Sequence, residues 1–279
     1  MITKNSVSAA KKGFGAQIRR VDGLVNPVVE AFDRIPDIPV ENPDPLAVKE
    51  ALSDKKILDD EAHEIFSRLI DSYIDIVSTS LKRVRFLMRN GPYVYSDAAD
   101  YGDDLTEQGM ISASMLNQLD VWKEQFAEYA TPDQIDELSQ KIAPHGNDLF
   151  KATEWMEGHR QELFDTMRTS PEEFDAFFSY VPAIAEDPKD FFSQNTLALG
   201  EAYTRAAEVT FDLIDNDLNR FGVIDYRLIP YGAGPLDELF NTRTTLRNSM
   251  ANELNSARAH LGYAKKYLDK ADTLAVVMN

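Results

Sequence analysis

The residues of this sequence that could do chemistry form fragments of known motifs rather than complete ones. Residues Asp60 to His63 spell Asp-Glu-Ala-His, the helicase box. That box must follow a buried strand and needs a phosphate-binding Gly-Lys-Thr loop elsewhere, which this sequence lacks. The turn from Gly232 to Gly234 precedes an expected helix, but Pro235 removes a donor and the acids after it would repel a phosphate. Neither fragment predicts a nucleotide site.

Metal sites and nucleophiles are equally incomplete. Helical di-iron proteins need a paired Glu-x-x-His motif, and only Asp60 with His63 has a similar spacing. The acids from Asp97 to Asp103 resemble a calcium loop, but Ala99 stands where a ligand belongs. The chain has no cysteine, which excludes thiolate chemistry and disulfides. With no carboxylate pair singled out among the 47 acids, the sequence predicts a protein that is not an enzyme and needs no cofactor or metal.

Negative charge is concentrated in the middle of the chain. Residues 97–190 contain 22 acidic and six basic residues and so carry nearly all of the net charge of −18. A pI near 4.6 disfavours direct binding to nucleic acid or to an anionic membrane, and no apolar run approaches the roughly 20 residues of a membrane span. We therefore expect a cytoplasmic protein whose macromolecular partners are basic.

The elements that position these residues are predicted to be helices. Periodic apolar residues over long stretches predict an all-α fold, a compact bundle of about seven to nine helices with long central and C-terminal helices. The central helix is expected from about Asp59 to Asn90. Residues 1–24 are basic and interrupted by glycine, so we expect a mobile basic N-terminal arm; the alternative is that it docks onto an acidic face. Residues 25–279 are expected to form a single α-helical domain with the acidic middle at 97–190.

The C-terminal helix carries a heptad pattern. Apolar residues alternate steps of four and three, which is typical of a helix–helix seam. Two partners for this seam are possible: an antiparallel helix of the same chain, such as the one ending near Arg220, or a second copy in a homodimer. The residues of the candidate dimer seam are Met250, Leu254, Ala257, Leu261 and Leu268.

Some of the acids in the middle of the chain are explained by local physics, and others are not. An acid in the first turn of a helix, such as Asp104, interacts favourably with the helix dipole. Like charges spaced four residues apart each cost roughly 0.2 to 0.5 kcal/mol in an isolated helix. Such a face either serves solubility or is complementary to a basic partner, for example a nucleic-acid-binding surface. The acids assigned to partner binding are Asp120, Glu124, Glu128, Glu154, Glu157, Glu162 and Asp165.

The run from Ser96 to Asp104 (SDAADYGDD), together with the acids at 120, 124 and 128, the helical character and the absence of cysteine, resembles the degradosome-interacting protein of giant bacteriophages. That resemblance implies an acidic helical homodimer that covers RNA-binding segments of the host ribonuclease E, in the host cytoplasm, and blocks RNA turnover. The leading expectation is thus a non-enzymatic inhibitor that masks a basic nucleic-acid-binding surface. The alternative is a helical structural or assembly protein such as a virion component.

Overall fold

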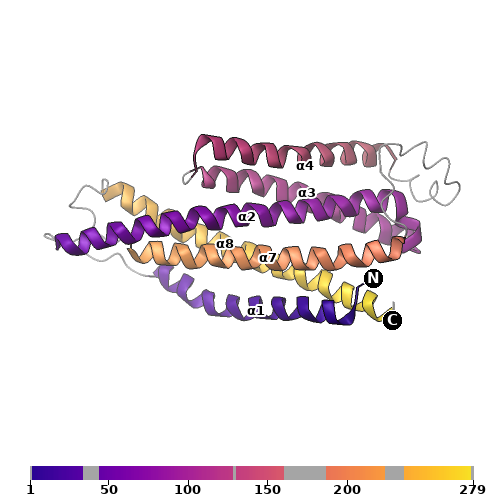
Figure 1. Ribbon diagram of the computed structural model, residues 1–279, viewed down its shortest axis with the longest axis horizontal. Coiled ribbons are helices and arrows are strands. Elements are labelled where there is room, and N and C mark those ends of the chain that lie inside the picture. The colour runs from indigo at the N-terminus through magenta and orange to yellow at the C-terminus, as the bar shows by residue number, and fades with distance from the viewer. Residues whose placement is uncertain (1, 34–43, 128–129, 160–186, 224–235, 278–279) are drawn as a thin grey trace.

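The computed structural model consists of long helices that lie side by side in an elongated bundle (Figure 1). It describes residues 2–33, 44–127, 130–159, 187–223 and 236–277. Among these residues, no helix combines the length and the apolar character needed to cross a lipid bilayer. The helices are α1 (Lys4–Asp33), α2 (Pro45–Val94), α3 (Ala98–Phe126), α4 (Pro132–His159), α7 (Pro188–Val223) and α8 (Leu236–Val277).

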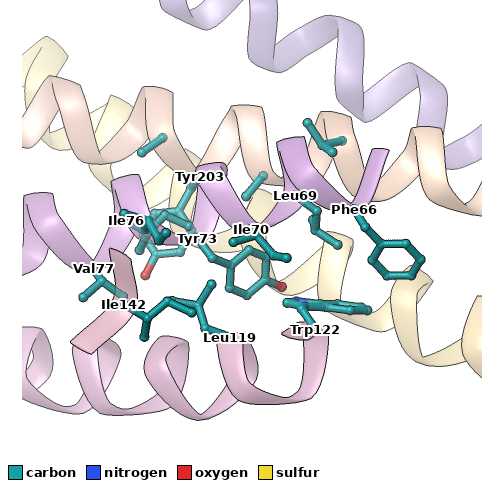
Figure 2. Packing of buried hydrophobic residues seen from close by; sticks show 14 of the residues in the cluster. Phe66, Leu69, Ile70, Tyr73, Ile76, Val77, Leu119, Trp122, Ile142 and Tyr203 are labelled. Atoms are coloured by element: carbon teal, nitrogen blue, oxygen red, sulfur yellow. The ribbon is translucent and has the colours of Figure 1, made fainter. Parts of the chain in front are cut away.

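Helix α2 is the central element of the bundle. Asp44 caps its start by accepting a hydrogen bond from the Leu46 amide at 3.0 Å, and Pro45 occupies the first turn, where its missing N–H costs nothing. Its broad apolar face packs against α3 on one side and α7 on the other. Figure 2 shows this core, in which side chains of α2 meet Leu119 and Trp122 of α3 and Tyr203 of α7.

The remaining helices extend the bundle in both directions from α2. Helix α4 lies beyond α3, and α8 packs along α7 (Figure 1). Contacts between Asp59 and Arg220 near one end, and between Arg83 and Asn195 near the other, show that α2 and α7 are antiparallel. Helices α3 and α8 also meet directly, since Gln108 Nε2 of α3 donates to the Tyr267 hydroxyl of α8 at 2.7 Å.

The all-α class is confirmed, but the described residues form six helices rather than seven to nine. One reason is that α4 continues through Pro144, although proline in a helix interior usually kinks or ends the helix. Pro144 is exposed, so water can satisfy the carbonyl that loses its partner there. The expected central helix also begins earlier, at Pro45. The helix expected near residues 171–180 lies outside the described residues.

The N-terminal residues differ from the expected mobile arm. They form α1, which packs against α7 and α8 and buries Val7, Leu24 and Val28. The basic residues that suggested a loose arm pair in cis: Arg20 Nη2 lies 2.7 Å from Asp212 and 2.6 Å from Asp215. The docked alternative is therefore the observed one, because the apolar stripe of α1 and its charges both find partners in the bundle.

The heptad seam of α8 is filled by the chain itself. Met250, Leu254, Ala257 and Leu261 are buried in a core with residues of α1 and α7, and Leu268 is buried against the start of α1 and Leu197. This is the intrachain, antiparallel arrangement. A homodimer through the same five residues would require them to leave this core.

Candidate partner-binding surface

The motif fragments do not assemble into chemical sites. His63 lies in the middle of the α2 sequence rather than after a strand, and its ring contacts the Phe126 ring with centroids 5.1 Å apart. Asp97 caps α3, accepting a hydrogen bond from the Ala99 amide at 2.6 Å. Within the described part of the chain, no group of three or more His, Asp and Glu residues is arranged to hold a metal ion.

The outer face of α3 has a distinct composition. We use this name for the residues that recur at three- and four-residue steps along the helix away from α2. The face is acidic at both ends, and its middle carries apolar side chains, with Met110 69% and Val121 44% exposed. Its residues are Asp100, Asp103, Glu107, Met110, Ser114, Asn117, Val121 and Glu124, with Asp120 beside them.

Of the acids assigned to partner binding, the structure brings Asp120 and Glu124 together near the end of α3. Asp120 keeps 65% of its side chain exposed and is contacted by Lys123 at 3.2 Å. Glu124 is exposed, and no described cation lies within ion-pair distance of it. Glu154 is exposed on α4, a different helix. The structure does not describe the side chains of Glu128, Glu157, Glu162 and Asp165.

A groove runs between α3 and α8, with α7 at its floor. Its volume is about 920 Å³. Four carboxylates line it from α3, and two ammonium groups line it from α8, so its charge is negative overall. The α3 wall is the first half of the outer face of α3, which connects the groove to the acidic surface further along the helix. The charged lining residues are Asp100, Asp103, Asp104, Glu107, Lys266 and Lys270.

The charges of the groove are unevenly compensated. Lys266 forms an ion pair with Glu107 across the groove. Lys270 donates to the Tyr95 hydroxyl at 2.9 Å, and burial lowers the pKa of its ammonium group. Asp100 and Asp103, in contrast, are exposed, and no described cation pairs with either carboxylate. The uncompensated negative charge is therefore at the end of the groove where α3 begins.

Three tyrosines form an aromatic stack at the floor. The Tyr203 ring stacks on Tyr263, with centroids 5.1 Å apart, and on Tyr267, with centroids 6.0 Å apart. Tyr263 is 37% exposed, whereas Tyr203 is fully buried. The Tyr203 hydroxyl has no hydrogen-bond partner. Burial raises the pKa of Tyr203 far above its usual value, so this hydroxyl stays neutral.

A buried ion pair supports the groove from behind. The fully buried Arg83 of α2 holds Asp104 of α3 through Nε at 3.0 Å and Nη2 at 2.6 Å. Tyr95 donates to Asp104 at 2.5 Å, and Gln108 Nε2 donates to Asp104 at 3.1 Å. Burial alone would raise the pKa of Asp104, but the nearby Arg83 more than offsets this and lowers it. Asp104 therefore stays ionised and fixes α3 to α2.

A second buried cluster lies toward the other end of the bundle. The guanidinium of Arg220 lies 3.2 Å from Asp217 through Nη1 and 3.2 Å from Asp59 through Nε, and its charge also acts on the buried Glu253. Burial raises the pKa of Asp217 to about 6, and burial and the charge of Asp217 raise the pKa of Glu253. The cluster is enclosed in the core, so we assign it a structural role.

Sequence reasoning missed Arg83, Lys270 and the three tyrosines. A basic residue near the C-terminal end of a helix interacts favourably with the helix dipole, but Arg83 follows Ile76 and Ser80 and precedes Leu87 on the buried side of α2. A cation at such a position signals a buried partner, because an unpaired buried charge is too costly to keep. The tyrosine stack had no comparable signal, since it joins residues of two helices that meet only in the folded chain.

The outer face of α3 and the groove beside it thus present exposed carboxylates without an ion-pair partner next to exposed apolar and aromatic side chains. No protein-family model, no curated protein and no solved structure matches this chain.

Proposed function

We propose that this protein binds a basic protein surface through the outer face of α3 and thereby masks that surface. The observation that carries the proposal is the set of exposed carboxylates on one helix that form no ion pair with a described cation: Asp100, Asp103 and Glu124. Repulsion among like charges works against such a face in the free protein. A partner bearing Lys and Arg removes this repulsion and gains favourable charge contacts.

The middle of the same face supports a protein partner in particular. Met110 and Val121 are exposed between the acidic ends, and interfaces combine such apolar contacts with a polar rim. The resemblance to the degradosome-interacting protein of giant bacteriophages narrows the partner to an RNA-binding segment of a host ribonuclease. Covering that segment would inhibit RNA binding, because carboxylates would take the place of the phosphates.

The test is charge reversal on the outer face of α3. In the variant Asp120→Lys with Glu124→Lys, we expect affinity for the basic partner to fall roughly tenfold or more, since two attractive charges become repulsive. The partner is captured from host lysate at low salt, identified, purified, and its affinity measured by titration calorimetry at several salt concentrations. Wild-type affinity should decrease steeply as salt increases.

A matched control is available on α1, at the opposite edge of the bundle from α4 (Figure 1). Asp22 and Glu30 are exposed there, and Asp22→Lys with Glu30→Lys changes the net charge by the same amount. This control should bind nearly as wild type does. Equal losses in both variants would mean that only the net charge matters, and unchanged binding in the α3 variant would rule out the proposed face.

A further inference from the structure

The groove between α3 and α8 contains groups that the chain itself leaves unsatisfied. The hydroxyl of the fully buried Tyr203 has no hydrogen-bond partner, although Tyr203 lines the groove. A buried hydroxyl without a partner costs free energy. Because this hydroxyl is covered by the groove lining, a ligand supplies the missing bond only when the side chains above it move aside. At the end of the groove, the exposed Asp100 and Asp103 form no ion pair with a described cation, although Lys270 lines the same groove. These are two independent signs of a ligand in one place.

We propose that the groove receives a short amphipathic segment of the basic partner. Its arginine or lysine side chains lie beside Asp100 and Asp103, and its apolar side chains lie against Met110 and Tyr263. This inference rests on the proposed function, because it names the place where the basic partner inserts.

The charge of the groove selects this occupant. Four carboxylates against two ammonium groups disfavour an anion such as a nucleic acid or a phosphate. Of the four carboxylates, Glu107 is paired with Lys266 and Asp104 with Arg83, which leaves Asp100 and Asp103 for a cation from outside. The exposed Tyr263 ring offers a face to a guanidinium or ammonium group.

The dimensions of the groove limit the segment to a few turns. Its α3 wall extends from Asp100 to Met115. At 1.5 Å per residue, this wall is about 22 Å long, the length of about four helical turns or about seven extended residues. A segment of that size can place cations at one end and apolar side chains at the other.

The experiment uses the full chain and two synthetic peptides of equal charge. In one peptide arginines alternate with leucines, and in the other serines replace the leucines. Affinities are measured by calorimetry at low salt. We expect the leucine peptide to bind more tightly than the serine peptide. We expect the variant Asp100→Asn with Asp103→Asn to bind the leucine peptide about fivefold to tenfold more weakly than the wild type does.

Tyr203→Phe separates ligand binding from folding. This variant keeps the stacked ring and removes only the hydroxyl, so the melting temperature of the free protein should stay the same or increase. Binding of the leucine peptide should nevertheless weaken about fivefold. If Tyr203→Phe bound the leucine peptide as tightly as the wild type does, the proposed hydrogen bond from the ligand to the Tyr203 hydroxyl would be ruled out.

The control pair Asp120→Asn with Glu124→Gln lies on α3 beyond the groove and tells the two proposals apart. If Asp120→Asn with Glu124→Gln weakens peptide binding while the Asp100 and Asp103 variant and Tyr203→Phe bind as the wild type does, the groove is excluded. The binding face is then confined to the end of α3 that carries Asp120 and Glu124. If no variant changes affinity, or if neither peptide binds at low salt, the groove proposal fails, whereas the acidic face is tested separately by charge reversal against the whole basic partner.

Discussion

Arg83 illustrates how a single side chain determines where the site lies. It is fully buried, and its guanidinium contacts Asp104, Thr196 and Asn195 and lies over the Phe192 ring at 4.2 Å. Through these contacts it joins α2 to α3 and α7 at the end of the groove where Asp100 lies. Removing one partner of such a pair leaves a buried charge without compensation, which costs far more than the pair contributes.

Replacing Arg83 by Met should therefore lower the free energy of unfolding by about 3 to 5 kcal/mol, as measured by urea denaturation. The matched control is Arg85→Met in the same helix, because Arg85 pairs with Asp148 where both side chains are about one third exposed. Arg85→Met should lower the free energy of unfolding by about 1 kcal/mol or less. Equal costs for the two variants would contradict the role assigned to Arg83.

The loss of stability caused by Arg83→Met should depend on pH. In the wild type, the pKa of Asp104 lies below the ordinary 3.8, so the contribution of the pair is present above that pH and is lost as pH falls through the folded-state pKa. Without Arg83, burial raises the pKa of Asp104, and protonation then relieves the buried charge. The stability difference between wild type and variant should shrink as the solution is acidified.

At the scale of elements, α7 and α8 pack most closely at Gly200. A Cβ atom added to Gly200 would lie 2.8 Å from Cγ and Cδ2 of Leu268. A carbon–carbon distance this short does not occur in a packed core. Gly200 lies one helical turn before Tyr203, which forms the groove floor. The separation of α7 and α8 is thus set by a residue without a side chain.

Gly200→Ala should lower the free energy of unfolding by about 1 kcal/mol, because overpacking of 1 to 3 kcal/mol outweighs the helix propensity gained by alanine. The matched change is Gly262→Ala on α8, where a Cβ atom meets nothing within 4 Å. That variant should be stabilised by up to about 1 kcal/mol. Thermal unfolding of both proteins tests the pair, and a stabilised Gly200→Ala would contradict the close approach.

At the scale of the whole molecule, α1 is an integral layer of the bundle. It buries Val7, Leu24 and Val28 against α7 and α8, and Lys11 Nζ lies 2.8 Å from Asp272. Burial of three such aliphatic side chains contributes roughly 5 to 9 kcal/mol as an upper estimate, which is comparable to the stability of a whole domain. A bundle without α1 would expose this part of its core.

Deleting residues 1–33 should therefore abolish cooperative unfolding near the wild-type melting temperature and expose hydrophobic surface that binds a dye such as ANS. Circular dichroism and dye fluorescence report the two effects. The control is Asp22→Ala with Glu30→Ala, which changes only exposed side chains of α1 and should change the melting temperature little. If the protein without residues 1–33 were as stable as the wild type, α1 would not be an integral layer of the bundle.

Periodicity alone predicted much of this fold. The apolar repeats identified the all-α class, the long central helix and the seam of α8, because a 3.6-residue period is a local property of the chain. The acidic spacing of Asp120 and Glu124 likewise predicted their exposure. The number of helices, the docking of α1 and the course of α4 through Pro144 were not predictable in this way, since each depends on packing between distant segments.

What the sequence by itself determined is therefore the helical class, the surplus of negative charge and its position in the middle of the chain. Tertiary structure alone decided that the α8 seam is filled by α7 and α1, that Arg83 meets Asp104, and that Tyr203 and Tyr263 face the acids of α3 across a groove. The physical reason is that charge and periodicity are properties of neighbouring residues, whereas a groove exists only where α3 and α8 are brought together by the helices between them.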